Sequence, residues 1–254
     1  MIIDAHMHVG EWDHPDFLGR ACDMTDVARV MTECGLDGAA IVPTDRCDNA
    51  GLLADMRRVQ SEGFGRALWF FPWVRPGGED LSWVEANLAV VTGLKIHPSL
   101  SRVRVSDPEF APALELAAAH ELVVLVHCGR WQEMASYRFA IEAAQRYPRA
   151  RFLLAHGGGD TPPLSTAAAE LVHETGVGNV WFEFSGLREY WVVERNVALL
   201  GAERYLMGSD YSLAHPRMYL GAVEGMALDA AAKDLIRGGN AQALFGAPLP
   251  VEAA

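Results

Sequence analysis

Eight short apolar runs, separated by segments with helical patterning, constrain the fold of this chain most strongly. Most of them are continuously apolar rather than alternating, which is typical of parallel strands buried on both faces. Leu122–Val126 and Phe152–Ala155 show this pattern best. The runs are Ile2–Ala5, Ala39–Pro43, Ala67–Val74, Gly93–His97, Leu122–His127, Arg151–His156, Asn179–Ser185 and Arg204–Ser209.

Helical signals fill the gaps between these runs. Thr25–Cys34 has apolar residues at helical spacing and stops at Gly35, and Asp107-Pro108 is a common helix start. Further helices are expected from Ser82, where Glu85 completes a capping box, and over Glu133–Tyr147, Thr166–Thr175, Tyr190–Leu200 and Ala230–Arg237. This alternation predicts an α/β protein, a single (β/α)8 TIM barrel over residues 1–254. The alternative is an open doubly wound sheet, but no G-x-G-x-x-G motif follows an early strand.

Composition and charge narrow the class of function. The chain has 254 residues, half of them hydrophobic, which suits one large core. Its net charge of −12 disfavours binding to nucleic acid or to an anionic membrane. No apolar run approaches the roughly 20 residues of a membrane helix, and Asp4 interrupts the N-terminus before a signal-peptide core could form. None of the four cysteines forms a C-x-x-C pair, so we expect a reducing, cytoplasmic location.

Histidines gather at the ends of the predicted strands. The first run leads into His6-Met7-His8, whose two imidazoles share one face of a strand and can converge on one cation. Later runs end in Lys95 with His97, His127 and His156, and the last leads into Asp210. Active residues of these barrels lie at the C-terminal ends of the strands. Imidazole and carboxylate suit zinc and its neighbours, so the pattern predicts a metal site.

With these residues placed, the chain resembles the amidohydrolase superfamily, in particular its amidohydrolase 2 branch, which includes aminocarboxymuconate-semialdehyde decarboxylase, resorcylate-type decarboxylases and several lactonases. The matching stretches follow the family's order along nearly the whole chain, and they identify the superfamily but not a substrate. They are Ile3–His8, Gly93–Pro98, Val126–Gly129, Leu154–Gly158, Met207–Tyr211 and Gly239–Phe245.

The resemblance implies a role for each residue of the constellation. It makes His6, His8, His127 and Asp210 the ligands of one divalent metal, with zinc as the default and iron, manganese or cobalt as alternatives. His156 would activate the metal-bound water or serve as the acid/base, and Asp210 would also accept a proton. Asp4 could accept a hydrogen bond from a ligand imidazole, or simply end its strand with a bond to a neighbouring loop.

Lys95 and His97 leave two interpretations open. In some binuclear members of the superfamily a lysine on the fourth strand is carboxylated and bridges two metals, and His127 and His156 would then bind the second ion. Otherwise Lys95 pairs with a carboxylate or a substrate anion, because a buried lone ammonium is costly. His97 would contact substrate, support a ligand or be structural. One ion is favoured over two.

Residues next to the predicted ligands are candidates for substrate binding. These are Trp12, Arg130 and Tyr211, with Arg188, Tyr190, His215 and Arg217 as weaker ones. An arginine at the rim would suit a carboxylate-bearing substrate through bidentate pairing, although such arginines also form ordinary surface ion pairs.

Three functions are compatible with these residues. The first is a metal-dependent hydrolase that uses a metal-activated water on an amide, lactone or other ester of a small molecule. The second is a metal-dependent, non-oxidative decarboxylase of an unsaturated or aromatic carboxylic acid. The third is a barrel that binds a metal or ligand without turnover, which predicts a damaged constellation, whereas every expected residue is present here. The expected partner is a small-molecule substrate, with a homodimer as an option.

Overall fold

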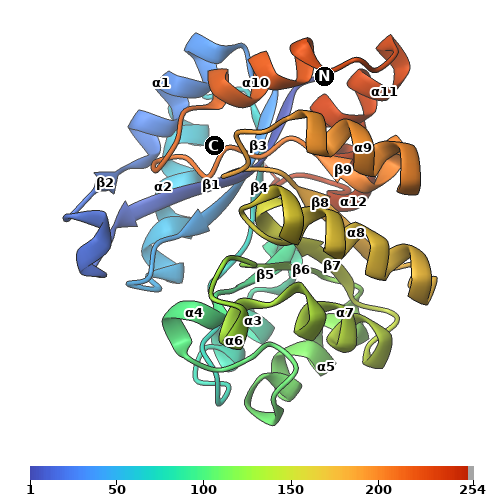
Figure 1. The fold of residues 1–254 in the computed structure, drawn as a ribbon. Coiled ribbons are helices and arrows are strands. Elements are labelled where there is room, and N and C mark those ends of the chain that lie inside the picture. Colours follow the sequence, from blue (N-terminus) through green and yellow to red (C-terminus); the bar gives the residue numbers. More distant parts are fainter. Residues whose placement is uncertain (251–254) are drawn as a thin grey trace.

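The protein is a (β/α)8 barrel in a computed structural model that describes residues 1–250. Parallel strands form the centre and helices surround them (Figure 1). The barrel strands are β1 (Ile3–Glu11), β3 (Gly38–Pro43), β4 (Ala67–Phe70), β5 (Gly93–Ile96), β6 (Val123–Val126), β7 (Arg151–Leu154), β8 (Val180–Glu183) and β9 (Tyr205–Leu206). Each lies within or overlaps one of the eight predicted runs. The short β2 (Ala21–Cys22) pairs antiparallel with the end of β1.

Two seams join the strands into a closed ring. Continuous ladders run through β1–β3–β4 and through β5–β6–β7–β8–β9. Single bridges between Trp73 and Lys95 and between Met7 and Tyr211 connect the two halves. The second seam is reinforced by the backbone N–H of Asp210, which donates to the carbonyl of His6 at 2.8 Å. The two seams therefore bring the ends of β1, β5 and β9 to one rim.

The helices follow the predicted order with some differences. Their bounds are α1 (Met24–Cys34), α2 (Asn49–Ser61), α3 (Leu81–Ala86), α4 (Pro98–Ser101), α5 (Ala111–His120), α6 (Gln132–Ala135), α7 (Tyr137–Arg146), α8 (Pro162–Thr175), α9 (Trp191–Leu200), α10 (Pro216–Gly225), α11 (Ala230–Asp234) and α12 (Asn240–Phe245). The single helix expected over Glu133–Tyr147 is wrong, because Ser136 is extended and its hydroxyl caps α7. The expected capping box at Ser82 is also absent, since α3 begins one residue earlier, at Leu81. Helices α2, α4, α10 and α12 lie outside the predicted helical segments.

Two apolar layers fill the molecule. Side chains such as Ile3, Leu125 and Leu153 fill the inside of the barrel. Side chains such as Val124 and Phe152 point outward and pack beneath the helices. Residues on both faces of the strands are buried, which explains why the strands read as continuous apolar runs.

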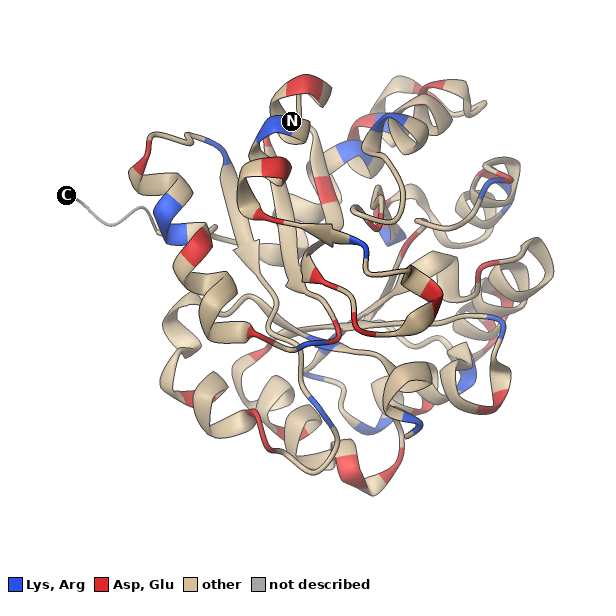
Figure 2. Cartoon of the chain, turned by 90° about the vertical axis from the view of Figure 1, so that its left-hand side faces the viewer, with Lys and Arg blue, Asp and Glu red and all other residues tan. Residues whose placement is uncertain are grey.

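Most charged side chains lie on the outer surface, whereas Asp4, Lys95 and Glu183 are completely buried. Figure 2 shows acidic and basic residues interspersed along the outer helices and loops. Several form ion pairs within one helix, such as Arg58 with Glu62 and Arg146 with Glu142. Within residues 1–250, no helix combines the length and the apolar character that crossing a bilayer requires.

Candidate metal centre and active site

Strand alternation brings Lys95, His97 and His127 to the inside of the barrel. On β5, Leu94 and Ile96 point outward into the helix layer, so Lys95 points inward and His97 follows on the same side. On β6 the inward Val123 and Leu125 are followed by His127. Because parallel strands end at one rim, these side chains meet above the apolar interior.

His6 and His8 reach the interior through an irregularity in β1. Ile3 and Ala5 belong to the barrel interior, whereas Met7 and Val9 belong to the outer layer. Strict alternation would therefore place His6 opposite to Ala5. The register between β1 and β3 shifts between Asp4 and Met7, and this bulge re-aims the strand so that His6 and His8 point inward.

His156 and Asp210 are placed by unusual backbone angles. Both have a left-handed conformation, with φ of 58° at each. Asp and His tolerate this region better than most residues. The left-handed conformation at His156 interrupts the inward–outward alternation of side chains after Ala155, which points inward. The imidazole of His156 therefore turns toward the cavity, which the Asp210 carboxylate also lines.

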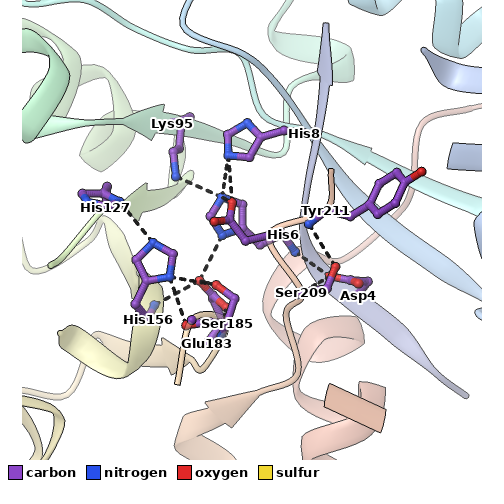
Figure 3. A network of polar contacts seen from close by, with 12 residues as sticks. Asp4, His6, His8, Lys95, His127, His156, Glu183, Ser185, Ser209 and Tyr211 are labelled. Atoms are coloured by element: carbon purple, nitrogen blue, oxygen red, sulfur yellow. Dashed lines mark hydrogen bonds and ion pairs between the residues drawn. The ribbon is translucent and has the colours of Figure 1, made fainter. Parts of the chain in front are cut away.

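Three of the predicted ligands converge. One donor atom from each of His6, His8 and Asp210 lies within 4.8 Å of the others. His6 Nε2 is 3.0 Å from His8 Nε2, and Asp210 Oδ1 is 3.3 Å from His8 Nε2 and 3.6 Å from His6 Nε2. Figure 3 shows the two imidazoles meeting beside Lys95. His127 lies outside this group of three but lines the same cavity.

The protonation of the two imidazoles fits a cation at this point. His6 Nδ1 lies 3.0 Å from Glu183 Oε1, and His8 Nδ1 lies 2.9 Å from the carbonyl oxygen of Pro43, which can only accept. Burial lowers the pKa of both imidazoles, so they are neutral and each carries one proton, on Nδ1. Two Nε2 lone pairs and a carboxylate oxygen then face one another, and a divalent ion suits such a donor set.

Lys95 lies against this group. The side chain is fully buried, and its Nζ is 3.0 Å from His6 Nε2. Burial lowers the pKa of the ammonium to about 8. Lys95 can therefore donate a hydrogen bond to the lone pair of His6 Nε2. His8 Nε2 and Asp210 Oδ1, in contrast, are both acceptors and face each other without a donor.

A second cluster of imidazoles lies next to the first. His156 Nε2 is 3.1 Å from His127 Nδ1, and the His127 ring stacks on His97 with centroids 3.8 Å apart. His97 stacks in turn on Trp73, while its Nδ1 accepts the backbone N–H of Leu100. His97 thus forms a wall of the cavity and caps α4, so its proton is on Nε2.

One cavity of about 240 Å³ is lined by all of the polar side chains that were predicted at the strand ends: His6, His8, Lys95, His97, His127, His156 and Asp210. Its wall contains most of the residues predicted from the sequence, including His156, Lys95 and Trp12. Apolar contacts come from Phe17 and Leu213. This volume lies just below the roughly 300–1,000 Å³ of typical ligand pockets, so the cavity has room only for a small molecule.

The three predicted substrate contacts have different positions. Trp12 is buried, packs edge-on against His8 at 4.7 Å and lines the cavity. Arg130 also lines it; its side chain is 77% exposed, and its Nε donates to Asp160 at 2.8 Å. Tyr211 does not line the cavity, because its ring points away from His6, His8 and His156 (Figure 3). The ring lies edge-on to that of His215, with centroids 6.4 Å apart. The structure therefore gives no support to Tyr211 as a substrate contact.

Sequence reasoning missed Glu183 and Ser185. Glu183 is completely buried. Its carboxylate forms hydrogen bonds with the imidazole of His6, the backbone N–H of His156 and the hydroxyl of Ser185. The available signal was a lone charge inside the apolar run Val180-Trp181-Phe182-Glu183-Phe184. A buried charge needs hydrogen-bond donors, and here these are the ring of His6, the backbone N–H of His156 and Ser185.

Solved structures of similar shape cover the whole barrel. They include 5-carboxyvanillate decarboxylase from Sphingomonas paucimobilis, at 16% identity over 96% of this chain and 98% of that chain, with a TM-score of 0.72. An amidohydrolase from Burkholderia multivorans with bound zinc has 18% identity over 98% and 100%, with a TM-score of 0.74. A "probable 2-pyrone-4,6-dicarboxylic acid hydrolase" from Acinetobacter baumannii with bound citric acid has 14% identity over 96% and 99%, with a TM-score of 0.73.

At these identities the structures support the fold alone. A search of curated protein sequences found no significant match. The sequence profile described as "Amidohydrolase" matches residues 3–247, which contain every strand of the barrel and every residue of the site. The chain therefore belongs to the amidohydrolase family.

Proposed function

We propose that this protein is a metal-dependent hydrolase that acts on an amide, lactone or other ester of a small, carboxylate-bearing molecule. The observation that carries the proposal is the convergence of His6 Nε2, His8 Nε2 and Asp210 Oδ1 beside a cavity that also contains His156. Family membership supports an enzyme of this general kind.

His6, His8 and Asp210 would hold the ion, with His127 as the proposed fourth ligand. Imidazole and carboxylate donors favour zinc, and we propose one ion per chain. A bound divalent ion would supply Lewis acidity toward a carbonyl oxygen and would lower the pKa of a coordinated water to about 7.

His156 is suited to move the proton. Its Nδ1 lies 3.0 Å from the carbonyl oxygen of Ser185, which can only accept, so the proton of the neutral ring is on Nδ1. The Nε2 atom therefore presents a lone pair in the cavity, where it can take a proton from water and return it to the leaving group. Asp210 is the second proposed proton acceptor.

Arg130 and Trp12 are the proposed substrate contacts. The exposed Arg130 guanidinium at the cavity wall can pair with a substrate carboxylate. The indole of Trp12 can support an apolar portion of the substrate. Arg130→Ala should raise KM while it changes the free energy of unfolding by less than about 0.5 kcal/mol, because exposed ion pairs contribute little to stability. An unchanged KM for a carboxylate substrate would remove Arg130 from the proposal.

A decarboxylase is the second candidate. It is supported by the solved structure of 5-carboxyvanillate decarboxylase, which shares the fold, and by the aromatic and apolar part of the cavity wall, Trp12, Phe17 and Leu213. In that reaction His156 would deliver a proton to the carbon that loses carbon dioxide. Product analysis separates the candidates, because only hydrolysis adds the elements of water.

The first experiment is elemental analysis of the purified protein and of Lys95→Ala. One metal per chain in both would support the single-ion site, and two in the wild type that fall to one in the variant would indicate a lysine-bridged pair. The second step is a substrate screen with His156→Ala, matched with His173→Ala on the exposed side of α8. No metal after reconstitution, or unchanged turnover in His156→Ala, would overturn the proposal.

We also propose a cytoplasmic location. All four cysteines are free thiols, among them the buried Cys22 and Cys128. Free thiols are usual in a reducing compartment.

A further inference from the structure

A single buried carboxylate connects the two halves of the site. Glu183 Oε1 lies 3.0 Å from Nδ1 of His6 and accepts the hydroxyl of Ser185 at 2.9 Å. The same hydroxyl oxygen lies 2.9 Å from Nδ1 of His156. Figure 3 shows Glu183 and Ser185 between the two imidazoles.

The backbone fixes which way these hydrogen bonds run. Glu183 Oε2 accepts the N–H of Ser185 at 2.8 Å, and Oε1 accepts the N–H of His156 at 3.2 Å. Backbone N–H groups can only donate, so both carboxylate oxygens are acceptors. The imidazole of His6 must therefore donate from Nδ1, and its Nε2 keeps the lone pair that faces His8.

The second branch acts on His156 through Ser185. The Ser185 hydroxyl donates its only proton to Glu183 Oε1, so it can only accept from His156 Nδ1. The carbonyl of Ser185, also 3.0 Å from that nitrogen, can likewise only accept. His156 is thereby held with its proton on Nδ1 and its lone pair on Nε2.

The backbone leaves room for this carboxylate. A Cβ atom at Gly208 would lie 2.4 Å from Glu183 Oε2, so only glycine allows the carboxylate its present position. Asp4, the nearest comparison, is also completely buried and accepts from the backbone N–H of His6 and Ser209, but within residues 1–250 its carboxylate has no hydrogen bond to an imidazole.

We propose that Glu183 is a positioning residue that holds both His6 and His156 in the Nδ1–H tautomer, the second through Ser185. One carboxylate thus sets the tautomer of both a proposed metal ligand, His6, and the proposed proton-transfer group, His156. The inference rests on the proposed function for the roles of these two histidines, but not for the tautomers themselves.

The test measures tautomers directly. In protein labelled with ¹⁵N-histidine and freed of metal by chelation, the ring ¹⁵N shifts of His6 and His156 should identify a protonated Nδ1 and an unprotonated Nε2. Their signals are assigned from His6→Asn and His156→Asn. A protonated Nε2 in either wild-type ring at neutral pH would overturn the proposal, and this result does not depend on any Glu183 variant folding.

The Glu183→Gln variant tests whether Glu183 is the cause of these tautomers. The amide NH2 group must face either His6 Nδ1 or the N–H of Ser185, so His6 should gain Nε2–H tautomer, and zinc should bind about 10–100-fold more weakly. Asp4→Asn, which also removes a buried carboxylate, should keep both tautomers. A folded Glu183→Gln with unchanged tautomers and unchanged zinc affinity would refute the role of Glu183. Failure of the wild type to bind zinc would instead refute the proposed function, while the tautomers would still decide the inference.

Discussion

Replacing Asp4 with asparagine should stabilise the metal-free protein at alkaline pH. Asp4 is completely buried; its Oδ1 accepts two backbone N–H groups, while Oδ2 has no hydrogen-bond partner among residues 1–250. Burial raises the pKa of its carboxyl from 3.8 to about 7, partly offset by the hydrogen bonds from Ser209 and His6. The charged form is therefore disfavoured in the folded state.

The sign and size follow from linkage. Between the unfolded pKa of 3.8 and the folded pKa of about 7, the native state binds more protons, so the wild type loses stability as pH rises through this window. A shift of about 3 units at about 1.4 kcal/mol per unit corresponds to about 4 kcal/mol above pH 7. At pH 4.5 only about 1 kcal/mol of this cost is present.

The stabilisation by Asp4→Asn should therefore grow by about 3 kcal/mol from pH 4.5 to pH 8. Urea unfolding in the presence of a chelator measures the difference at each pH. The cost of burying an amide group at the unpartnered Oδ2 position does not depend on pH, so it cancels in this comparison. Asp55→Asn, on the exposed face of α2, should change stability by less than about 0.5 kcal/mol at both pH values. An Asp4→Asn effect that does not vary with pH would refute the reasoning.

The remaining predictions concern the metal and the space around Glu183. Zinc at about 100 times its Kd should stabilise the folded state by about 2.7 kcal/mol and raise Tm by roughly 5–10 °C. His8→Ala should abolish this rise in differential scanning calorimetry and His173→Ala should keep it; an equal rise in both would place the zinc elsewhere. Gly208→Ala should lower the free energy of unfolding by about 1–3 kcal/mol, because its Cβ would lie 2.4 Å from Glu183 Oε2. Chemical denaturation checks this against Gly221→Ala, whose Cβ would meet no atom within 4 Å, and equal stability of the two variants would contradict the close approach.

Strand order and the inward-facing residues of β5 and β6 could be predicted from the sequence. Continuous apolar runs predict the strands, period-two alternation places Lys95 and His97 on one face, and His127 is expected at the same rim because it ends a strand. The same rule could not find the bulge that re-aims β1, since a bulge depends on the register with β3, which the sequence of one strand does not contain.

Two other differences between expectation and structure have equally local causes. Tyr211 follows Asp210 directly in sequence, yet the left-handed backbone at Asp210 directs the tyrosine ring away from the cavity. Glu183 is not predicted as a site residue because its apolar neighbours give the segment the pattern of an ordinary buried strand. A charge inside such a run was visible, but its partners come from β1 and from the turn after β7, which only the closed barrel brings close.

The left-handed backbone at His156 and Asp210 lowers the stability of the folded protein at two residues that the proposed reaction needs. This conformation costs a non-glycine residue about 1–2 kcal/mol of folding free energy, and it does not cost glycine this amount. A selection for heat resistance alone would accordingly favour glycine at both positions and recover folded proteins without the proposed acid/base and a proposed ligand. Engineering more stable forms of this protein therefore needs a simultaneous selection for the proposed turnover, because two of the substitutions that relieve backbone strain lie at the residues that would carry out the reaction.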